Sequence, residues 1–234
     1  MVGVVVASHG KLAEELIRTA EGVVGPLESV AGVAVSATEP DSRGRPQGHW
    51  PCLARIAEGD EVTVPAGIAL VRIDNRLVHG QVLEAWVPAL SAQGILVADD
   101  EVAANPLARA AMSLAIPKKI AFHVAPIAEV AAMLRPGGPG APAPRTLVLV
   151  RNVRDAAALR EQGVPLPHLN LGNVHFSEGR AQVTPTVYLD AAEIEALEQL
   201  GATGTEIEAR AVPAETPVTL PAIAERFRAG EPRK

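Results

Sequence analysis

The chain has 234 residues, of which 48% are hydrophobic, and its formal net charge at pH 7 is −6. This length gives room for one large or two small domains, and the composition excludes a disordered chain. The acidic charge and the 3% aromatic content argue against a nucleic-acid-binding surface, which is usually basic and often carries stacking aromatic rings.

Features of the chain also bear on its compartment. Cys52 is the only cysteine, so an intramolecular disulfide framework is excluded and a cytoplasmic location is expected. No apolar run approaches the roughly 20 residues that span a bilayer. The N-terminal apolar run, Val2 to Ala7, is short and has no basic leader, which argues against a signal peptide.

The first third of the chain predicts an incomplete β-α-β unit. Residues 2–7 are typical of a buried strand, apolar residues then recur at helical spacing from Leu12 to Val24, and residues 30–35 predict a second strand. Residues 37–51 are rich in proline and glycine and show no periodicity, which is typical of a linker.

From residue 67 onward, strands and helices alternate regularly. The runs ILVA (95–98) and TLVLV (146–150) lack polar alternation, as expected of parallel strands that are buried on both faces. We therefore predict an α/β fold with an open, largely parallel sheet and helices on both faces. The expected strands are 68–73, 94–98, 119–124, 146–151, 168–171 and 205–212, and the expected helices are 80–90, 101–115, 126–134, 153–162 and 190–200. Residues 174–189 predict a hairpin with its turn at Ser177-Glu178-Gly179.

A short polar turn follows the first strand of this region and contains Asp74, Arg76 and His79. Open parallel sheets bind ligands at the carboxyl ends of their strands, and the helix that begins at Gly80-Gln81 presents free N–H groups that suit a phosphate. Arg76 adds a planar donor fork that matches phosphate oxygens. Asp74 is a candidate for orienting the imidazole. These residue types predict that His79 is a nucleophile toward phosphorus.

Each of these residues also has a purely structural interpretation. A single His-Gly after a strand is usually a helix start, and Arg76 with Asp74 can form a surface ion pair worth less than about 1 kcal/mol. Asp99-Asp100-Glu101 is better explained as a strand end with a charged first helical turn than as a metal site, so no metal is predicted. His123 is expected to pack in the core. His168 and His175 flank residues 170–173, so either is a candidate for lining the site.

The spelling of the polar turn is more specific than its composition. The segment RIDNRLVHGQV (72–82) resembles the active-site signature of the IIB domain of the mannose/fructose/sorbose family of sugar phosphotransferase systems (PTS). The resemblance continues in VADDEVAA (97–104), in NLGN (170–173) and at Glu193-Ile194-Glu195, and it covers about residues 67–226.

The resemblance implies a protein-N(pi)-phosphohistidine–sugar phosphotransferase. His79 would accept phosphate from a IIA phosphocarrier and pass it to a sugar that the membrane subunits IIC and IID import. Arg76 would bind the phosphoryl group with Gly80 and Gln81, and a loop at 170–173, including Gly172 and Asn173, would border the site. The family commonly has a second glycine at the position of Asn173. The resemblance implies no cofactor and no nucleic-acid partner. It implies a protein that lies in the cytoplasm, peripherally associated with the inner-membrane permease. It is also compatible with a homodimer.

The N-terminus carries a second resemblance. Residues 2–35, with SHGKLAEE (8–15), resemble the start of the matching IIA domain, in which a histidine after the first strand carries phosphate. Only about 36 residues match, and neither the threonine-aspartate strand end nor the Gly-Gly-Ser-Pro loop of that domain is present. We therefore interpret His9 as a vestigial phosphosite. The predicted division is an incomplete IIA-like fragment at 1–38, a linker at 39–66 and a IIB domain at 67–228.

Two functions are open at this point. The first is the phosphohistidine carrier of a sugar-importing system, and the second is a regulatory PTS protein that signals phosphorylation state without transporting sugar. An unrelated nucleotide-binding α/β domain is disfavoured, because no glycine-rich phosphate loop follows any expected strand.

Overall fold

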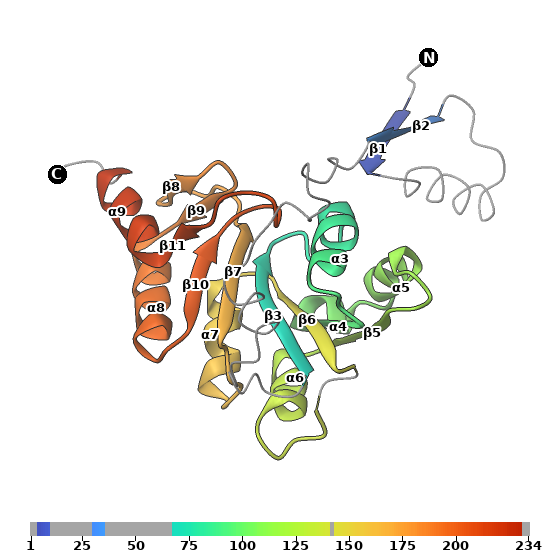
Figure 1. Cartoon of the computed structure of the whole chain (residues 1–234), viewed down its shortest axis with the longest axis horizontal. Helices are drawn as coiled ribbons and strands as arrows, with labels where there is room; N and C mark the ends of the chain where they lie inside the picture. The colour runs from blue at the N-terminus through green and yellow to red at the C-terminus, as the bar shows by residue number, and fades with distance from the viewer. Residues whose placement is uncertain (1–3, 10–29, 36–66, 141–142, 231–234) are drawn as a thin grey trace, which may run out of the picture.

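The computed structural model describes residues 4–9, 30–35, 67–140 and 143–230 (Figure 1). In the N-terminal part, β1 (Val4–His9) and β2 (Val30–Val35) pair in parallel, with Val4 opposite Val30 and His9 opposite Val35. Both strands were expected, and their parallel pairing agrees with a β-α-β unit. The helix expected between them and the linker at 39–66 lie outside the described residues.

The main body is built on a seven-stranded sheet with the order β11-β10-β7-β3-β6-β4-β5. All neighbouring strands are parallel except β11, which runs antiparallel to β10 at the edge. The predicted largely parallel sheet is confirmed. Its strands are β3 (Gly67–Asp74), β4 (Gly94–Ala98), β5 (Ala121–Ala125), β6 (Arg145–Val150), β7 (His168–Asn173), β10 (Glu206–Ala209) and β11 (Val218–Thr219).

Helices cover both faces of this sheet, and each face has its own apolar core (Figure 1). One face is covered by α6 (Ile127–Leu134), α7 (Val153–Glu161), α8 (Ala191–Ala202) and α9 (Leu220–Gly230). The other is covered by η1 (Val82–Trp86), α3 (Val87–Ala89), α4 (Asp100–Ala104) and α5 (Pro106–Ala115). Successive residues of β3 alternate between the two cores, with Leu70 in one and Val71 in the other. Because side chains alternate along a strand, Arg72 faces the same side as Leu70.

One expected helix is divided at a proline, and another is present with a widened π-helical segment before a proline. The single helix expected at 101–115 is wrong: Asn105 is extended, and its side chain accepts hydrogen bonds from the N–H groups of Leu107 and Ala108 at 3.1 Å, so α5 begins separately at Pro106. This is the ordinary place for a proline, which lacks the N–H that a helix interior requires. The helix expected at 80–90 is present over residues 80–89, and its turn before Pro88 widens into the π-helical segment η1.

The hairpin expected within 174–189 exists, but its turn is not at Ser177-Glu178-Gly179. The antiparallel pair is β8 (Ala181–Thr184) and β9 (Val187–Leu189), so the chain reverses at Pro185-Thr186. Proline is favoured in turns because its φ is already fixed. The glycine-containing segment lies before β8 and only leads into the hairpin.

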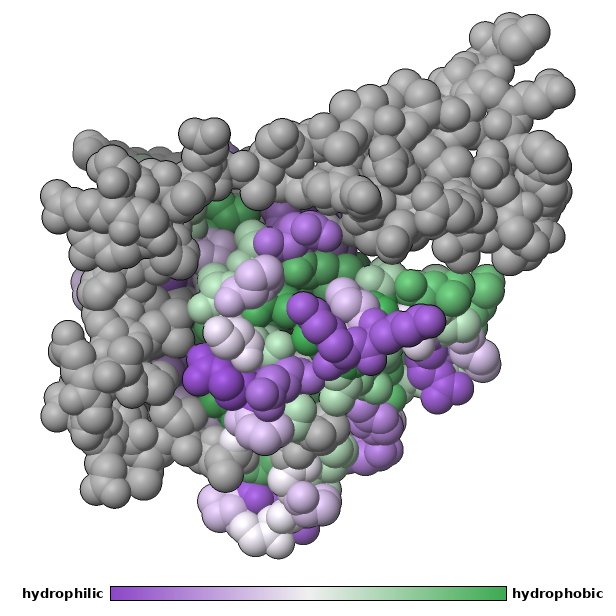
Figure 2. Space-filling view, turned by 45° about the vertical axis from the view of Figure 1, so that its right-hand side comes forward, coloured by the Kyte–Doolittle hydropathy of each residue, from purple (hydrophilic) through white to green (hydrophobic). Residues whose placement is uncertain are grey.

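The far edge of the sheet differs from expectation at His123. The residue was expected in the core, but β5 is an edge strand, and the side chain of His123 is 44% exposed and lies 3.6 Å from Glu129. On the same side of the molecule, α5 exposes Leu107 and Leu114, and Figure 2 shows hydrophobic residues beside hydrophilic ones over this face. In the part of the chain that the structure describes, no helix is both long and apolar enough to cross a bilayer.

Candidate phosphoryl-transfer site

The site lies at the carboxyl end of β3, the central strand, between the ends of β6 and β7. Asp74 is the last residue of β3, and its side chain is fully buried. Burial alone would raise the pKa of the Asp74 carboxyl. The hydrogen bonds from His79 and Arg76 and the charge of Arg72 outweigh burial, however, and hold that pKa well below its usual range. Asp74 is therefore a permanent anion at neutral pH.

His79 lies against this anion. Its Nε2 is 2.9 Å from Asp74 Oδ2, and 16% of its side chain is exposed, so the histidine is largely enclosed but still reachable from solvent. An ionised carboxylate only accepts hydrogen bonds, so Nε2 must carry the proton that Asp74 accepts. No described residue hydrogen-bonds to Nδ1. In the neutral imidazole the reactive lone pair is consequently on Nδ1.

Arg76 completes the group around Asp74. Its Nε donates to Asp74 Oδ1 and its Nη2 to Oδ2, both at 3.0 Å, and Nη2 also donates to Gln81 Oε1 at 3.0 Å. The side chain is 38% exposed, and its Nη1 makes no hydrogen bond to a described residue. Arg76 thus offers a cationic donor at the open side of the site.

The backbone between Arg76 and Gln81 is held by one buried side chain. Leu77 has a φ of 56°, a left-handed conformation that is uncommon for a residue other than glycine, and its side chain packs in the apolar core beside Trp86. Its N–H donates to Asp74 O at 2.9 Å, which closes a tight turn. The helix then begins at Gly80, where the first N–H groups have no acceptor within the helix.

Gly172 and Asn173 lie in a strand and not in the loop that was expected. Residues 170–173 form the end of β7 rather than a loop. The register shifts here, with Ile73 opposite Leu171 and Asp74 opposite Asn173, so Gly172 is the extra residue of a β-bulge. A Cβ at Gly172 would lie 1.9 Å from Arg72 Cζ, which explains the need for glycine at this position. Asn173 O accepts a hydrogen bond from Asn75 N at 3.0 Å.

Sequence reasoning assigned no role to Asn75 and Arg72, although both lie in the motif. Asn75 Oδ1 accepts from His175 N at 2.6 Å and its Nδ2 donates to Arg151 O at 3.3 Å, so it links the ends of β6 and β7 beneath the polar turn. Arg72 is fully buried and donates to Asp74 Oδ2 at 2.8 Å. The sequence signal that could have revealed a role for Arg72 is a charged residue directly after the apolar run of a predicted buried strand.

The other candidates lie elsewhere or have structural partners. His168 begins β7, at the opposite end of that strand from the site, and its Nδ1 is 3.1 Å from Glu206. His175 is exposed and lies beside Asn75 through its backbone. Asp99 caps α4 and pairs with Arg151 at 2.6 Å, in line with the predicted strand end and helix start. The described residues include no group of three or more side chains that could hold a metal ion.

Comparison with known proteins identifies the family that this geometry fits. The family model of the PTS system sorbose subfamily IIB component matches residues 68–231, so the chain belongs to that family. It shares 35% identity over 153 residues with the N-acetylgalactosamine-specific phosphotransferase enzyme IIB component 2 of Escherichia coli K12, covering 65% of this chain and 96% of that protein. The crystal structure of the IIBSor domain of the sorbose permease from Klebsiella pneumoniae superposes with a TM-score of 0.63 at 30% identity, covering 68% of this chain and 97% of that one.

A longer relative matches over part of its length. The chain is 36% identical over 146 residues to the mannose-specific EIIAB component of the PTS from Escherichia coli K12. This match covers 62% of the present chain but only 44% of the relative, so the chain spans less than half of that protein.

Proposed function

We propose that this protein is a phosphohistidine carrier of a sugar phosphotransferase system, with Nδ1 of His79 as the atom that carries the phosphoryl group. The single observation that carries the proposal is the pairing of His79 Nε2 with the buried anion Asp74, which leaves Nδ1 as the free nitrogen. The activity is that of a protein-N(pi)-phosphohistidine–sugar phosphotransferase.

In the first half-reaction, the lone pair of Nδ1 attacks the phosphorus of a IIA phosphohistidine. The donor P–N bond breaks and its electron pair returns to the donor imidazole. His79 keeps its Nε2 proton, and the positive charge that develops on its ring is stabilised by Asp74, 2.9 Å away. Arg76 and the free N–H groups at the start of the helix at Gly80-Gln81 stabilise the phosphoryl oxygens.

In the second half-reaction, a sugar hydroxyl attacks the same phosphorus and the bond to Nδ1 breaks. The bonding pair returns to Nδ1 as its lone pair, and the hydroxyl proton passes to a base or to water. His79 is thereby restored as a neutral imidazole whose Nε2–H still donates to Asp74. The sugar is presented by IIC and IID permease subunits, which places the protein in the cytoplasm, peripherally associated with the inner membrane. Gly172 and Asn173 border the site from the end of β7.

We also propose the division of the chain into an incomplete IIA-like fragment (1–38), a linker (39–66) and a IIB domain (67–228). The match of the family model to residues 68–231 supports the last of these. His9 ends β1 in the fragment, and we propose that it is vestigial, so that the phosphate comes from a separate IIA protein.

The experiment is phosphorylation of the purified chain by a phosphorylated IIA protein of the family. We expect one phosphoryl group, mapped to Nδ1 of His79 by mass spectrometry and by ³¹P–¹⁵N correlation, and no label on His79→Ala. His175→Ala is the matched control, because this neighbouring histidine is exposed, and it should label normally. Label that persists on His79→Ala, or that appears on His9, would refute the proposed route.

A further inference from the structure

Beneath His79, on the side of the sheet that carries Trp86, lies a buried arginine with four hydrogen bonds. Arg72 Nη2 donates to Asp74 Oδ2 at 2.8 Å and to Ala211 O at 3.1 Å. Its Nη1 donates to Asn170 Oδ1 and, at 3.3 Å, to Arg210 O. These partners come from β3 itself, from β7 and from the segment that follows β10, so the guanidinium position is determined by three parts of the sheet.

The polar chain continues away from the site on the neighbouring strands. Asn170 Nδ2 donates to Glu208 Oε1 at 3.0 Å, and the same oxygen accepts from Arg210 Nε at 2.8 Å. The Asn170 amide therefore has its oxygen toward a cation and its nitrogen toward an anion, and each partner fixes the orientation of the next. All three side chains are buried.

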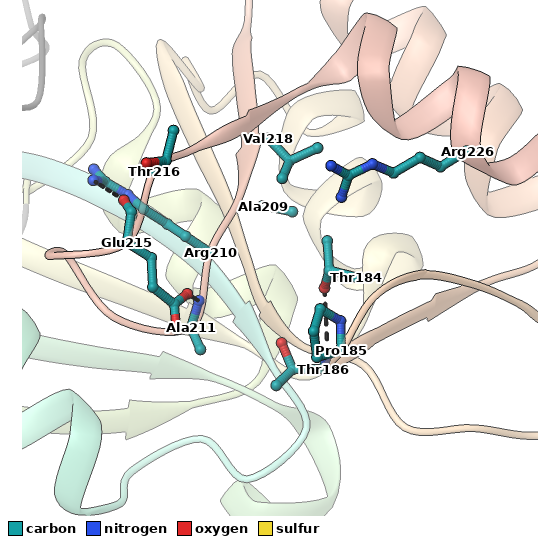
Figure 3. A pocket seen from close by; sticks show the side chains of 10 residues that line it. All are labelled: Thr184, Pro185, Thr186, Ala209, Arg210, Ala211, Glu215, Thr216, Val218 and Arg226. Atoms are coloured by element: carbon teal, nitrogen blue, oxygen red, sulfur yellow. Dashed lines mark hydrogen bonds between the residues drawn. The ribbon is translucent and has the colours of Figure 1, made fainter.

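Trp86 and the segment after β10 enclose this chain. The guanidinium carbons of Arg72 and Arg210 lie 4.8 Å and 5.4 Å from the centre of the Trp86 ring, and Trp86 Nε1 donates to Ala211 O at 2.9 Å. Figure 3 shows how Glu215 holds the backbone of this segment beside a cavity of about 280 Å³, with its Oε2 accepting from Ala211 N at 2.7 Å. The carbonyl group of Ala211 is thus fixed as an acceptor for Arg72.

A cation at this position is costly. Burial lowers the pKa of Arg72 to about 10, against the attraction of Asp74. An apolar side chain of similar volume would fill the space beside Trp86 without this desolvation. What Arg72 adds is a fixed donor on the carboxylate that pairs with His79.

The Asp74 carboxylate has two arginine partners that differ in their exposure and in their access to the phosphoryl group. Arg76 is 38% exposed and lies at the open side of the site, so an arriving phosphoryl group competes for its donors. Arg72 is fully enclosed and has no path to the phosphate. When Arg76 turns to the phosphoryl oxygens, Arg72 is the arginine that still holds Asp74 Oδ2, the oxygen that accepts from His79 Nε2.

We propose that Arg72 is a positioning residue for phosphoryl transfer, held in place by Asn170 and Glu208, which keeps Asp74 aimed at His79 Nε2 throughout the cycle. The inference rests on the function proposed for His79. It differs from that function in assigning a role to residues that touch neither the histidine nor the phosphoryl group.

The test is Arg72→Lys, which keeps the charge but not the planar fork that serves four acceptors. In the wild-type chain, ¹⁵N NMR of His79 should show the tautomer protonated at Nε2. In Arg72→Lys we expect a mixture of tautomers and a phosphorylation rate lower by roughly 10- to 100-fold, the size of effect seen when residues that orient a metal-binding histidine are lost. Arg145→Lys is the matched control, because Arg145 also serves a buried carbonyl, Leu90 O at 2.9 Å, but at the opposite end of the sheet. It should change neither the tautomer nor the rate.

Glu208→Gln is the second variant, and it tests the positioning role of Arg72 if Arg72→Lys does not fold. It preserves the shape and Oε1 as an acceptor while removing the charge three contacts away from Asp74, through Asn170 and Arg72. We expect a shift in the same direction for both tautomer and rate. A wild-type tautomer and rate in the folded variants would overturn the inference. Failure of the wild-type chain to accept phosphate would instead refute the function proposed for His79, since the tautomer measurement does not depend on phosphorylation.

Discussion

The close approach of Arg72 to the backbone of β7 gives a quantitative prediction for Gly172→Ala. The added Cβ would lie 1.9 Å from both Cζ and Nη2 of Arg72 and 2.4 Å from Nη1. Ordinary contacts between such atoms are about 3.5–4.0 Å, so the guanidinium has to move by roughly 1.5 Å or more. A displacement of that size breaks the 2.8 Å hydrogen bond to Asp74.

Two terms contribute to the expected loss of stability. Overpacking a buried site costs about 1–3 kcal/mol, and a lost hydrogen bond between charged buried groups costs about 1.5–3 kcal/mol. Their sum, roughly 2.5–6 kcal/mol, is a large fraction of the 5–15 kcal/mol that separates a typical folded domain from its unfolded state. We therefore expect a folded but weakened protein that accepts phosphate slowly.

Equilibrium urea unfolding measures the first effect, and labelling by phosphorylated IIA measures the second. With a slope of about 2 kcal/mol per molar urea, the midpoint should fall by about 1–3 M. Gly230→Ala is the matched control, because its Cβ would find its nearest neighbour, Ala181 Cβ, at 3.6 Å, an ordinary contact. Combining Gly172→Ala with Arg72→Ala should cost less than the sum of the two single changes, because the clash is removed. A Gly172→Ala protein with wild-type midpoint and labelling rate would show that the guanidinium position does not matter.

Two further predictions concern acid and a helix end. The folded-state pKa of Asp74 is depressed, so the contribution of its charge to stability is complete above the unfolded-state pKa of about 3.9 and is lost as the pH falls below that value. Urea midpoints measured from pH 6 downward should therefore decline less steeply for Asp74→Asn than for the wild-type chain. Parallel curves for the two proteins would contradict this. Asn105→Ala removes the cap of α5 and should lower the free energy of unfolding by about 1 kcal/mol while leaving phosphate transfer unchanged. A thermal melt measures the loss of stability, and the labelling assay measures phosphate transfer. An unchanged melting temperature would show that this cap does not stabilise the protein.

The sequence-based predictions succeeded where a structural feature depends on neighbouring residues in the chain, and they failed where it depends on distant ones. The run TLVLV specified β6 because a strand buried on both faces needs no more than continuous apolar residues. The helix at 101–115 was predicted as one piece because apolar periodicity masked a local signal, the Asn-Pro pair at 105–106. His123 was misplaced for a different reason: whether β5 lies at an edge depends on strand order, which no local pattern encodes.

The sequence by itself determined the order of strands and helices and the polar turn with Asp74, Arg76 and His79, because these depend on neighbouring residues and their propensities. Only the tertiary structure decided which nitrogen of His79 is free, because that follows from the position of the Asp74 carboxylate. It also decided that Asn170 and Glu208, about 100 and 136 residues after Arg72 in the sequence, complete the support of that carboxylate. They meet because β7 and β10 pair in register on one side of β3, and such long-range pairing brings together groups whose separation along the chain gives no sign of contact.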